Sequence, residues 1–197
     1  MTKFFKLLLA STTMAGLAVA ASPVHAQEAA LVAADAMLSE TERLNIWFDA
    51  KFEEQLAFSP IRQTLLGRRT AYDQIDDYSV AAADRQLAWM QEATAEMKRD
   101  FDYDKLSPDA KISWDMWLFR LEQAEAGVPF RQNSYVLHQF NGQQSFFPTF
   151  LINQHRVASE SDMVAFIERV KGSARALDQL LERAQANAES GTRPPRF

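Results

Sequence analysis

The sequence predicts an all-α fold, an array of about five to six helices with one long irregular segment rich in aromatic residues. Several stretches repeat apolar residues at alternating steps of three and four, which is the spacing of one helix face. Serine residues suited to the N-cap position precede most of these stretches. No stretch of useful length alternates apolar and polar residues in the way that a half-buried strand does.

The first 26 residues have the pattern of a signal peptide. Two lysines form a basic start, residues 7–21 are mostly apolar, and residues 24–26 fit the small-x-small cleavage rule. An uncleaved anchor helix is the competing interpretation, but the apolar run is short and is followed by Ser-Pro. We therefore expect cleavage after Ala26, a mature chain that begins at Gln27, and a periplasmic or secreted protein with no further membrane association.

The composition of residues 27–197 suits one domain with a sizeable apolar core. Without Lys3 and Lys6, 19 basic and 26 acidic residues leave a net charge of −7, with no basic patch of the kind that nucleic acid needs. The chain has no cysteine, which excludes disulfides, thiol nucleophiles and thiolate metal sites.

The first helix of the mature chain is expected from a capping box at residues 39–42 to about Phe58. Its predicted buried stripe is Leu44, Trp47, Phe48, Phe52 and Leu56. Ser59 and Pro60 begin the next helical turn, because proline is favoured at the first helical position. Gly67 then suits a left-handed C-terminal cap.

Residues 68–78 are polar and predict a loop that contains the adjacent acids Asp76 and Asp77. Such a pair can bind a metal or act in acid/base chemistry, but a solvated approach to a helix is favoured because no other ligand is spaced nearby. Ser79 can cap the second long helix. Its predicted packing seam is Val80, Ala83, Leu87, Met90, Thr94, Met97 and Phe101.

Two further long helices are expected nearer the C-terminus. Ser107 and Pro108 open the first and Gly127 closes it, and its apolar residues occupy more than one face, which predicts a central helix. Those residues are Ile112, Trp114, Met116, Trp117, Leu118, Phe119 and Leu121. The second helix starts at residues 159–162 and ends at Gly191. Its predicted stripe is Met163, Phe166, Val170, Ala174, Leu177, Leu181 and Ala184.

Between these two helices, residues 130–156 form an aromatic and amide-rich segment that carries no charge from Gln132 to Gln154. An Asn-Gly pair and Pro148 interrupt it, so the expected structure is irregular backbone buried under helices, with amide side chains that satisfy backbone groups. A connection that crosses the core and the lining of a cleft both fit this pattern. In the second case the candidate substrate-binding residues are Tyr135, His138, Gln139 and Asn141.

The sequence offers no recognisable catalytic centre. The mature chain has two histidines, His138 and His155, and neither belongs to an HExxH helix. Neither a GxSxG nucleophile elbow nor a GxxxxGK[ST] phosphate loop is present. We therefore expect no catalytic residue, no metal ligand and no cofactor in this chain. A hydrogen-bonded structural role is favoured for His138, and an exposed or capping position for His155.

Four segments resemble the N-terminal third of the bacterial "domain of unknown function 885" family. They are TERLNIWFDAKFEEQLAFSPIRQTLLG, FDYDKLSPDAKISWDMWLFRLEQAEAGVPF, QFNGQQSFFPTFLINQHRV and GTRPPRF, and they cover most of the mature chain in order. The family tends to carry an Asn-Gln pair before a glycine in the third segment. Here His138 and Gln139 stand at that place, followed by Gly142.

The resemblance implies an exported, mostly helical protein related in architecture to long-cleft zinc metallopeptidases, with the zinc motif in a C-terminal part outside this chain. On this basis the leading hypothesis is an N-terminal cleft-wall fragment, truncated at the C-terminus and inactive alone, whose partners are the C-terminal part and a peptide substrate. The alternative is a stand-alone periplasmic α-helical binding or interaction domain with no catalysis. The closing Pro-Pro-Arg-Phe favours a chain that continues into another element.

Overall fold

A computed structural model describes residues 38–140 and 142–195 of the chain. In this part the chain forms six α-helices, two short 3₁₀ turns and no strand, which confirms the all-α prediction. The predicted signal peptide and its cleavage site lie outside the described residues. None of the described helices is long and apolar enough to cross a membrane.

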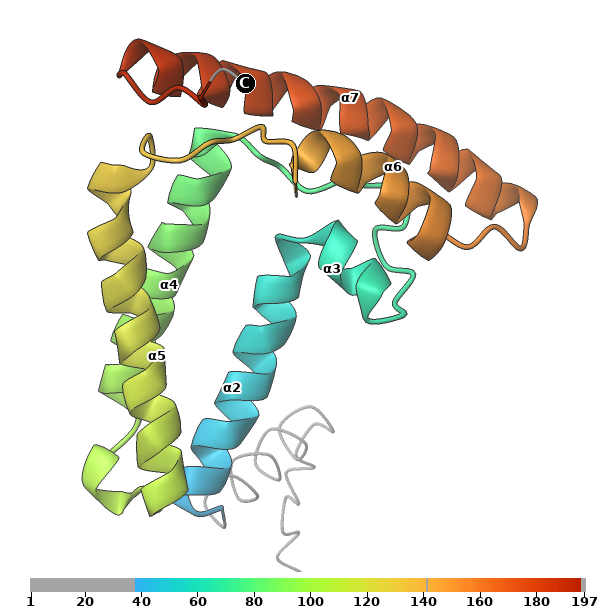
Figure 1. Cartoon of the computed structure of the whole chain (residues 1–197). Coiled ribbons are helices and arrows are strands. Elements are labelled where there is room, and N and C mark those ends of the chain that lie inside the picture. Colours follow the sequence, from blue (N-terminus) through green and yellow to red (C-terminus); the bar gives the residue numbers. More distant parts are fainter. Residues whose placement is uncertain (1–37, 141, 196–197) are drawn as a thin grey trace, which may run out of the picture. The chain divides into compact units, whose positions relative to one another are not determined.

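The helices follow one another with short connections (Figure 1). They are α2 (Glu40–Ala57), α3 (Pro60–Leu65), α4 (Val80–Asp100), α5 (Pro108–Gly127), α6 (Gln143–Gln154) and α7 (Glu160–Glu189), with 3₁₀ turns at Tyr103–Lys105 and Val128–Phe130. Five of the six begin behind a serine whose hydroxyl accepts a hydrogen bond from an N–H of the first turn. These serines are Ser39, Ser59, Ser79, Ser107 and Ser159, so the predicted helix starts are confirmed.

The first hydrophobic core joins α2, α4 and α5, which lie side by side in Figure 1. Leu44 and Trp47 of α2 meet Met97 of α4 and Trp114 of α5. The Trp47 ring contacts the Trp117 ring edge to face, with 5.1 Å between centroids. The stripe predicted for α2 is therefore buried at Leu44, Trp47 and Leu56, while Phe52 lies at its exposed edge.

The prediction that α5 is a central helix is wrong. Only Ala110 and Trp114 of its twenty residues are buried, and Trp117 is half-buried, with its indole N–H donating to Thr94 Oγ1 at 2.9 Å. The apolar residues on its other faces are exposed. Helix α5 therefore packs on α2 and α4 along one side and leaves an apolar surface uncovered by the described residues.

The second hydrophobic core lies between α3, α6, α7 and the segment that precedes α4. Ile61 of α3 and Ile75 pack with Phe147 and Phe150 of α6 and with Leu180 of α7. Figure 1 shows α6 and α7 side by side over the length of α6. This second core holds the loop between α3 and α4 against α7.

The aromatic segment is only partly irregular, which corrects the expectation for residues 130–156. Residues 131–140 and 142 are irregular, whereas Gln143–Gln154 form α6 even though Pro148 lies inside the helix. An interior proline costs about 3 kcal/mol, because it removes one backbone hydrogen bond. Burial of Phe147, Phe150 and Leu151 contributes about 1.5–3 kcal/mol for each side chain and outweighs that cost.

Candidate functional site

The structure does not bring the predicted substrate-binding residues into a recognisable site. Tyr135 is about half exposed, and Gln139 and His138 are also exposed. The backbone carbonyl of His138 accepts a hydrogen bond from Nε2 of Gln144 at 2.5 Å. Asn141 lies outside the described residues. The assignment of these four residues to substrate therefore stays a prediction.

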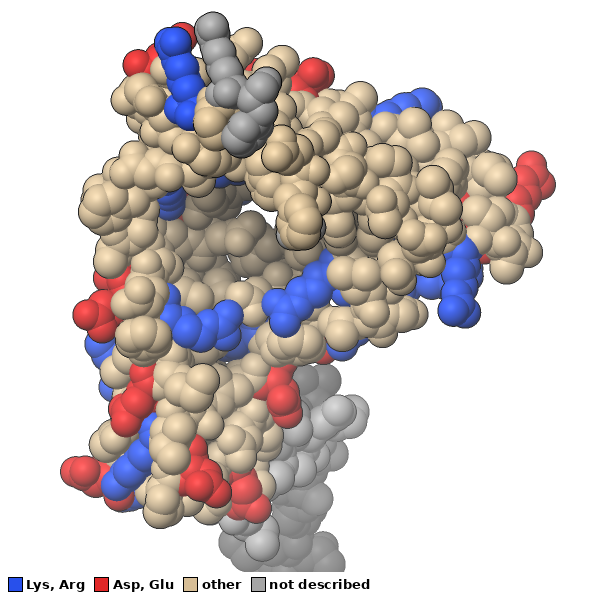
Figure 2. Space-filling model, in the orientation of Figure 1, with Lys and Arg blue, Asp and Glu red and all other residues tan. Residues whose placement is uncertain are grey.

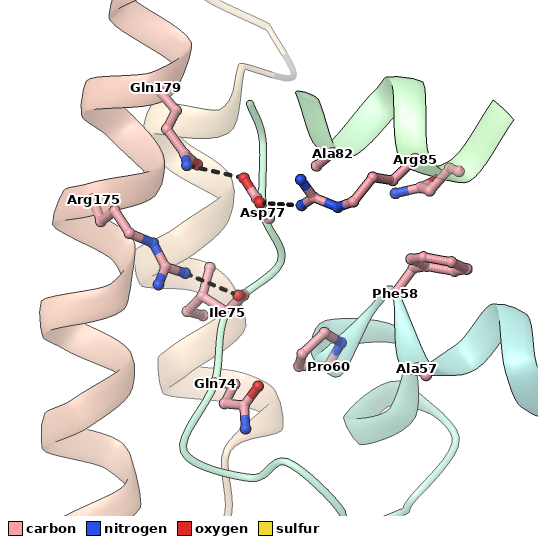
Figure 3. A pocket seen from close by; sticks show the side chains of 11 residues that line it. Ala57, Phe58, Pro60, Gln74, Ile75, Asp77, Ala82, Arg85, Arg175 and Gln179 are labelled. Carbon is pink, nitrogen blue, oxygen red and sulfur yellow. Dashed lines mark hydrogen bonds and ion pairs between the residues drawn. The ribbon is translucent and has the colours of Figure 1, made fainter. Parts of the chain in front are cut away.

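A polar cavity of about 340 Å³ lies where the extended segment 74–78 passes beside α7, the junction of α2 and α3, and the start of α4 (Figure 3). It is lined by Ala57, Phe58, Pro60, Gln74, Ile75, Asp77, Ala82, Arg85, Gln86, Arg175 and Gln179. These residues come from four separate stretches of the chain, so only the folded domain brings them together. The volume lies in the range of small-ligand sites.

The carboxylate of Asp77 accepts hydrogen bonds from several groups on the polar side of this cavity (Figure 3). One carboxylate oxygen accepts from the backbone N–H of Ser79 at 3.0 Å and from Nε2 of Gln179 at 2.9 Å, and the other accepts from Arg85 at 2.8 Å. The bonds from Ser79, reinforced by Arg85 and Gln179, lower the pKa of Asp77 to about 2. A carboxylate this acidic is a poor general base near neutral pH, so Asp77 positions its neighbours.

The lining of the cavity suits binding better than covalent chemistry. Arg85 and Arg175 supply guanidinium groups, and Gln74, Gln86 and Gln179 supply amides. None of the eleven lining residues is a serine, threonine, cysteine or histidine, and the one carboxylate, Asp77, is already engaged by Ser79, Arg85 and Gln179. The arrangement can recognise a polar or anionic group by hydrogen bonds.

Long polar side chains of α7 hold the segment beside this cavity through its backbone. Arg169 donates to the carbonyl of Gln74 at 3.0 Å, and Arg175 donates to that of Ile75 at 3.2 Å. At Gly172 an added Cβ would lie 3.3 Å from Ile75, so the absence of a side chain there lets the segment pack closely on the helix.

The buried stripe predicted for α7 is wrong in part, because Met163, Val170 and Leu181 are about half exposed.

Arg169 and His155 form a buried polar pair that the sequence did not indicate. Arg169 is fully buried and His155 is 5% exposed, so the exposed position predicted for His155 is wrong. The capping position, which was the other prediction, is confirmed because His155 is the C-cap residue of α6. Arg169 donates to Nδ1 of His155 at 3.0 Å and to Oγ1 of Thr64 at 2.6 Å. Because Nδ1 accepts, the ring carries its hydrogen on Nε2, which donates to the carbonyl of Asp162 at 3.0 Å. His155 is therefore neutral in this arrangement.

Acid is expected to destabilise the protein through His155. Burial lowers the pKa of His155 below its ordinary value, and the charges of Arg169 and Arg69 act in the same direction, against the bond to Asp162. Between the two pKa values the unfolded chain binds a proton at His155 that the folded chain does not bind. The free energy of unfolding is therefore highest above about pH 6.5 and decreases as the pH falls toward the folded pKa. The decrease is at most about 1.4 kcal/mol per pH unit. Urea unfolding at pH 7, 6 and 5 measures this loss. A wild-type curve that is flat in this range, or a His155→Gln variant with the same slope, contradicts the assignment.

The adjacent carboxylates Asp76 and Asp77 have separate capping roles. Asp76 accepts from the Ser59 hydroxyl at 2.6 Å and from the backbone N–H of Ile61 at 2.9 Å, so it binds the N-terminus of α3. Burial raises the pKa of Asp76 despite these bonds. Asp77 is exposed and binds the N-terminal region of α4 through Ser79. Among the described residues, no group of three or more histidine, aspartate or glutamate side chains could hold a metal ion.

Comparison with known protein families gives one match. Residues 60–197 match the family model described as "Bacterial protein of unknown function (DUF885)". Neither the curated proteins nor the solved structures contain a chain that matches this one. The matched residues extend from the start of α3 to the C-terminal end of the sequence. They include the pair of Arg169 and His155 and all residues of the cavity beside Asp77 except Ala57 and Phe58. The chain therefore belongs to the DUF885 family of bacterial proteins of unknown function.

Proposed function

We propose that this chain forms the N-terminal helical wall of a cleft in an exported, zinc-peptidase-like protein and that it has no catalytic activity alone. Zinc and the catalytic groups belong to a C-terminal part of the same polypeptide, which is the partner of this chain, and a peptide is the substrate. The mature protein is periplasmic or secreted after cleavage behind Ala26. The proposal combines membership of the family with the surface that the helices leave uncovered.

The observation that carries this proposal is an exposed apolar stripe on α5. Ile112, Met116 and Phe119 are 59%, 60% and 59% exposed, at steps of four and three that place them on one side of the helix. Met116 also belongs to a groove of about 320 Å³ between α2 and α5, lined by Phe48, Lys51, Phe52, Gln55, Ser113, Met116, Trp117 and Arg120. A contiguous apolar surface of this kind is typical of an interaction site.

A second surface with the same property lies on α6 and the segment before it. Phe140 is 86% exposed and Ile152 is 77% exposed. Helix α6 carries no charged residue, and Figure 2 shows a largely uncharged face over this helix above a hollow that is bordered by Lys and Arg side chains. Further polypeptide that covers α5 and α6 would remove both apolar surfaces from water. The hydrophobic effect would then stabilise the association of this helical wall with the rest of the protein.

The test uses the mature chain recovered from the periplasm, with Gln27 as the expected first residue. It should bind a hydrophobic dye and self-associate, because the α5 stripe is exposed, despite a net charge that favours solubility. Addition of the polypeptide encoded downstream of Phe197 should suppress both effects. The variant with Ile112, Met116 and Phe119 changed to glutamine is the control, and it should bind clearly less dye while it retains its helical circular dichroism, because of the two apolar surfaces only that of α6 remains. A wild-type chain that stays monomeric and binds no dye would sink the proposal.

The alternative is a stand-alone periplasmic binding domain, and the cavity beside Asp77 favours it. That cavity is complete within the described residues and contains groups suited to recognition. A monomeric chain that unfolds in one sharp transition and binds no dye would support this second function. Metal analysis serves both proposals, because we expect no stoichiometric zinc in the dialysed chain by itself.

A further inference from the structure

A second polar cavity, of about 350 Å³, lies at the opposite end of the loop between α3 and α4. The C-terminal end of α3, the residues just after it and the C-terminal end of α6 form its walls. Its lining residues are Thr64, Leu65, Gly67, Arg68, Arg69, Tyr72, Gln154 and Arg156. Three of these eight residues are arginines and none is acidic.

The charges of the three arginines are only partly balanced. Arg68 forms a two-pronged pair with Glu53, one prong of which is 2.7 Å long, and Arg69 pairs with Asp162 at 2.5 Å. The guanidinium of Arg156 is exposed and forms no ion pair with any carboxylate of the described residues. Arg156 therefore contributes a positive charge that is available to a ligand.

The fully buried Arg169 behind this wall adds to the positive potential. It donates to Thr64, His155 and backbone carbonyls, which are all neutral acceptors. Asp73 and Asp76 attract Arg169, but neither forms an ion pair with it in the described structure. Charge buried without a paired carboxylate is screened little by solvent, so Arg169 favours an anion in the adjacent cavity.

The walls of this cavity are fixed before any ligand binds. Gly67 has a φ of +79°, a left-handed conformation that ends α3 and turns the chain toward Arg68 and Arg69. The Tyr72 hydroxyl accepts from the backbone N–H of Arg156 at 2.7 Å and donates to its carbonyl at 3.0 Å. The Tyr72 ring also stacks on His155, with 4.1 Å between centroids. Tyr72 thus holds the backbone of Arg156 at the rim, which lowers the ordering cost of binding.

We propose that this cavity binds an anionic oxygen group, either a carboxylate or a phosphate, with Arg156 as its main ligand. A guanidinium group matches both groups through two parallel N–H donors. The Gln154 amide lies in the same wall and can donate to the bound group, whereas the Tyr72 hydroxyl already donates its hydrogen to the backbone of Arg156. This site is separate from the apolar surfaces of α5 and α6, so it goes beyond the proposed cleft-wall function and does not depend on it.

Titration of the mature chain at constant ionic strength tests the site. The probes are inorganic phosphate, N-acetyl-trialanine with a free C-terminal carboxylate, and N-acetyl-trialanine amide as the matched uncharged ligand, each followed by amide shifts in NMR spectra. Phosphate, or N-acetyl-trialanine but not its amide, should shift residues of this cavity. The Arg156→Gln variant should bind the same probe about tenfold more weakly or worse. Binding of phosphate alone or of N-acetyl-trialanine alone identifies which anion the site prefers.

Lys98→Gln is the control variant, because Lys98 in the last turn of α4 is also exposed and forms no ion pair with the described residues. It should keep the affinity within about twofold, since charges farther away than a Debye length are screened. Equal losses in both variants would show a general charge effect and overturn the proposal. Shifts that avoid this cavity, or no shift by any anionic probe at millimolar concentration, would overturn it as well.

Discussion

Replacement of Arg169 by alanine is expected to destabilise the protein by about 3–5 kcal/mol, a large fraction of the stability of an ordinary domain. The change leaves the acceptors on Thr64, His155 and Gln74 without their buried donor, and each such group costs about 1–3 kcal/mol. It also removes the guanidinium that lies 5.2 Å from the centre of the Phe150 ring. Equilibrium urea unfolding followed by far-ultraviolet circular dichroism measures the loss.

The matched control for this prediction is Arg175→Ala on the same helix. Arg175 is exposed and donates one hydrogen bond at 3.2 Å to the carbonyl of Ile75, which water can replace. We expect a change of about 1 kcal/mol or less. Equal effects of the two variants would mean that Arg169 acts only as a helix residue and that its buried bonds contribute nothing. Arg169→Lys should also be costly, because a lysine keeps the charge and loses the planar fork.

Replacement of Phe147 by alanine is expected to cost about 3–5 kcal/mol, because the ring is 1% exposed and lies in the second core. It packs edge to face on Tyr78, with 5.5 Å between the ring centroids. The substitution therefore both leaves a cavity in the core and removes this aromatic contact. Thermal and urea unfolding of the variant give the free energy. The same change at Phe140, which is 86% exposed, should stay within about 0.5 kcal/mol. Comparable losses at the two positions would contradict the packing of α6 described here.

Helix starts were predictable from the sequence because their signals are local. A serine hydroxyl and the N–H group that it accepts from lie three residues apart, as at Ser79 and Ala82. The left-handed glycines Gly67 and Gly191 are local signals of the same kind, and both were confirmed. The buried stripe of α2 was also largely correct, since its core residues are apolar and periodic.

The buried stripe of α7 and the role of His155 could not be predicted in this way. Arg169 is buried because its acceptors lie at Thr64 and Gln74, about a hundred residues earlier in the chain, and hydrophobic periodicity does not register such partners. The same limit applies to α6, since Pro148 is a strong local signal against a helix and only the tertiary burial of Phe147 and Phe150 overrides it. Buried polar residues such as Arg169 therefore cannot be recognised from hydrophobic periodicity alone.

The capping box of α7 sets the rotational phase of the whole helix. The Ser159 hydroxyl accepts from the N–H of Asp162, and the Asp162 carboxylate accepts from the N–H of Ser159, so the first turn has one permitted register. A slip of one residue would rotate every side chain by about 100° and shift it by about 1.5 Å along the axis. Arg169, ten residues after the cap, would then point away from the segment that it binds. The capping box at one end of a 30-residue helix therefore helps to place Arg175 and Gln179, which follow Arg169 on the same helix, in the wall of the cavity beside Asp77.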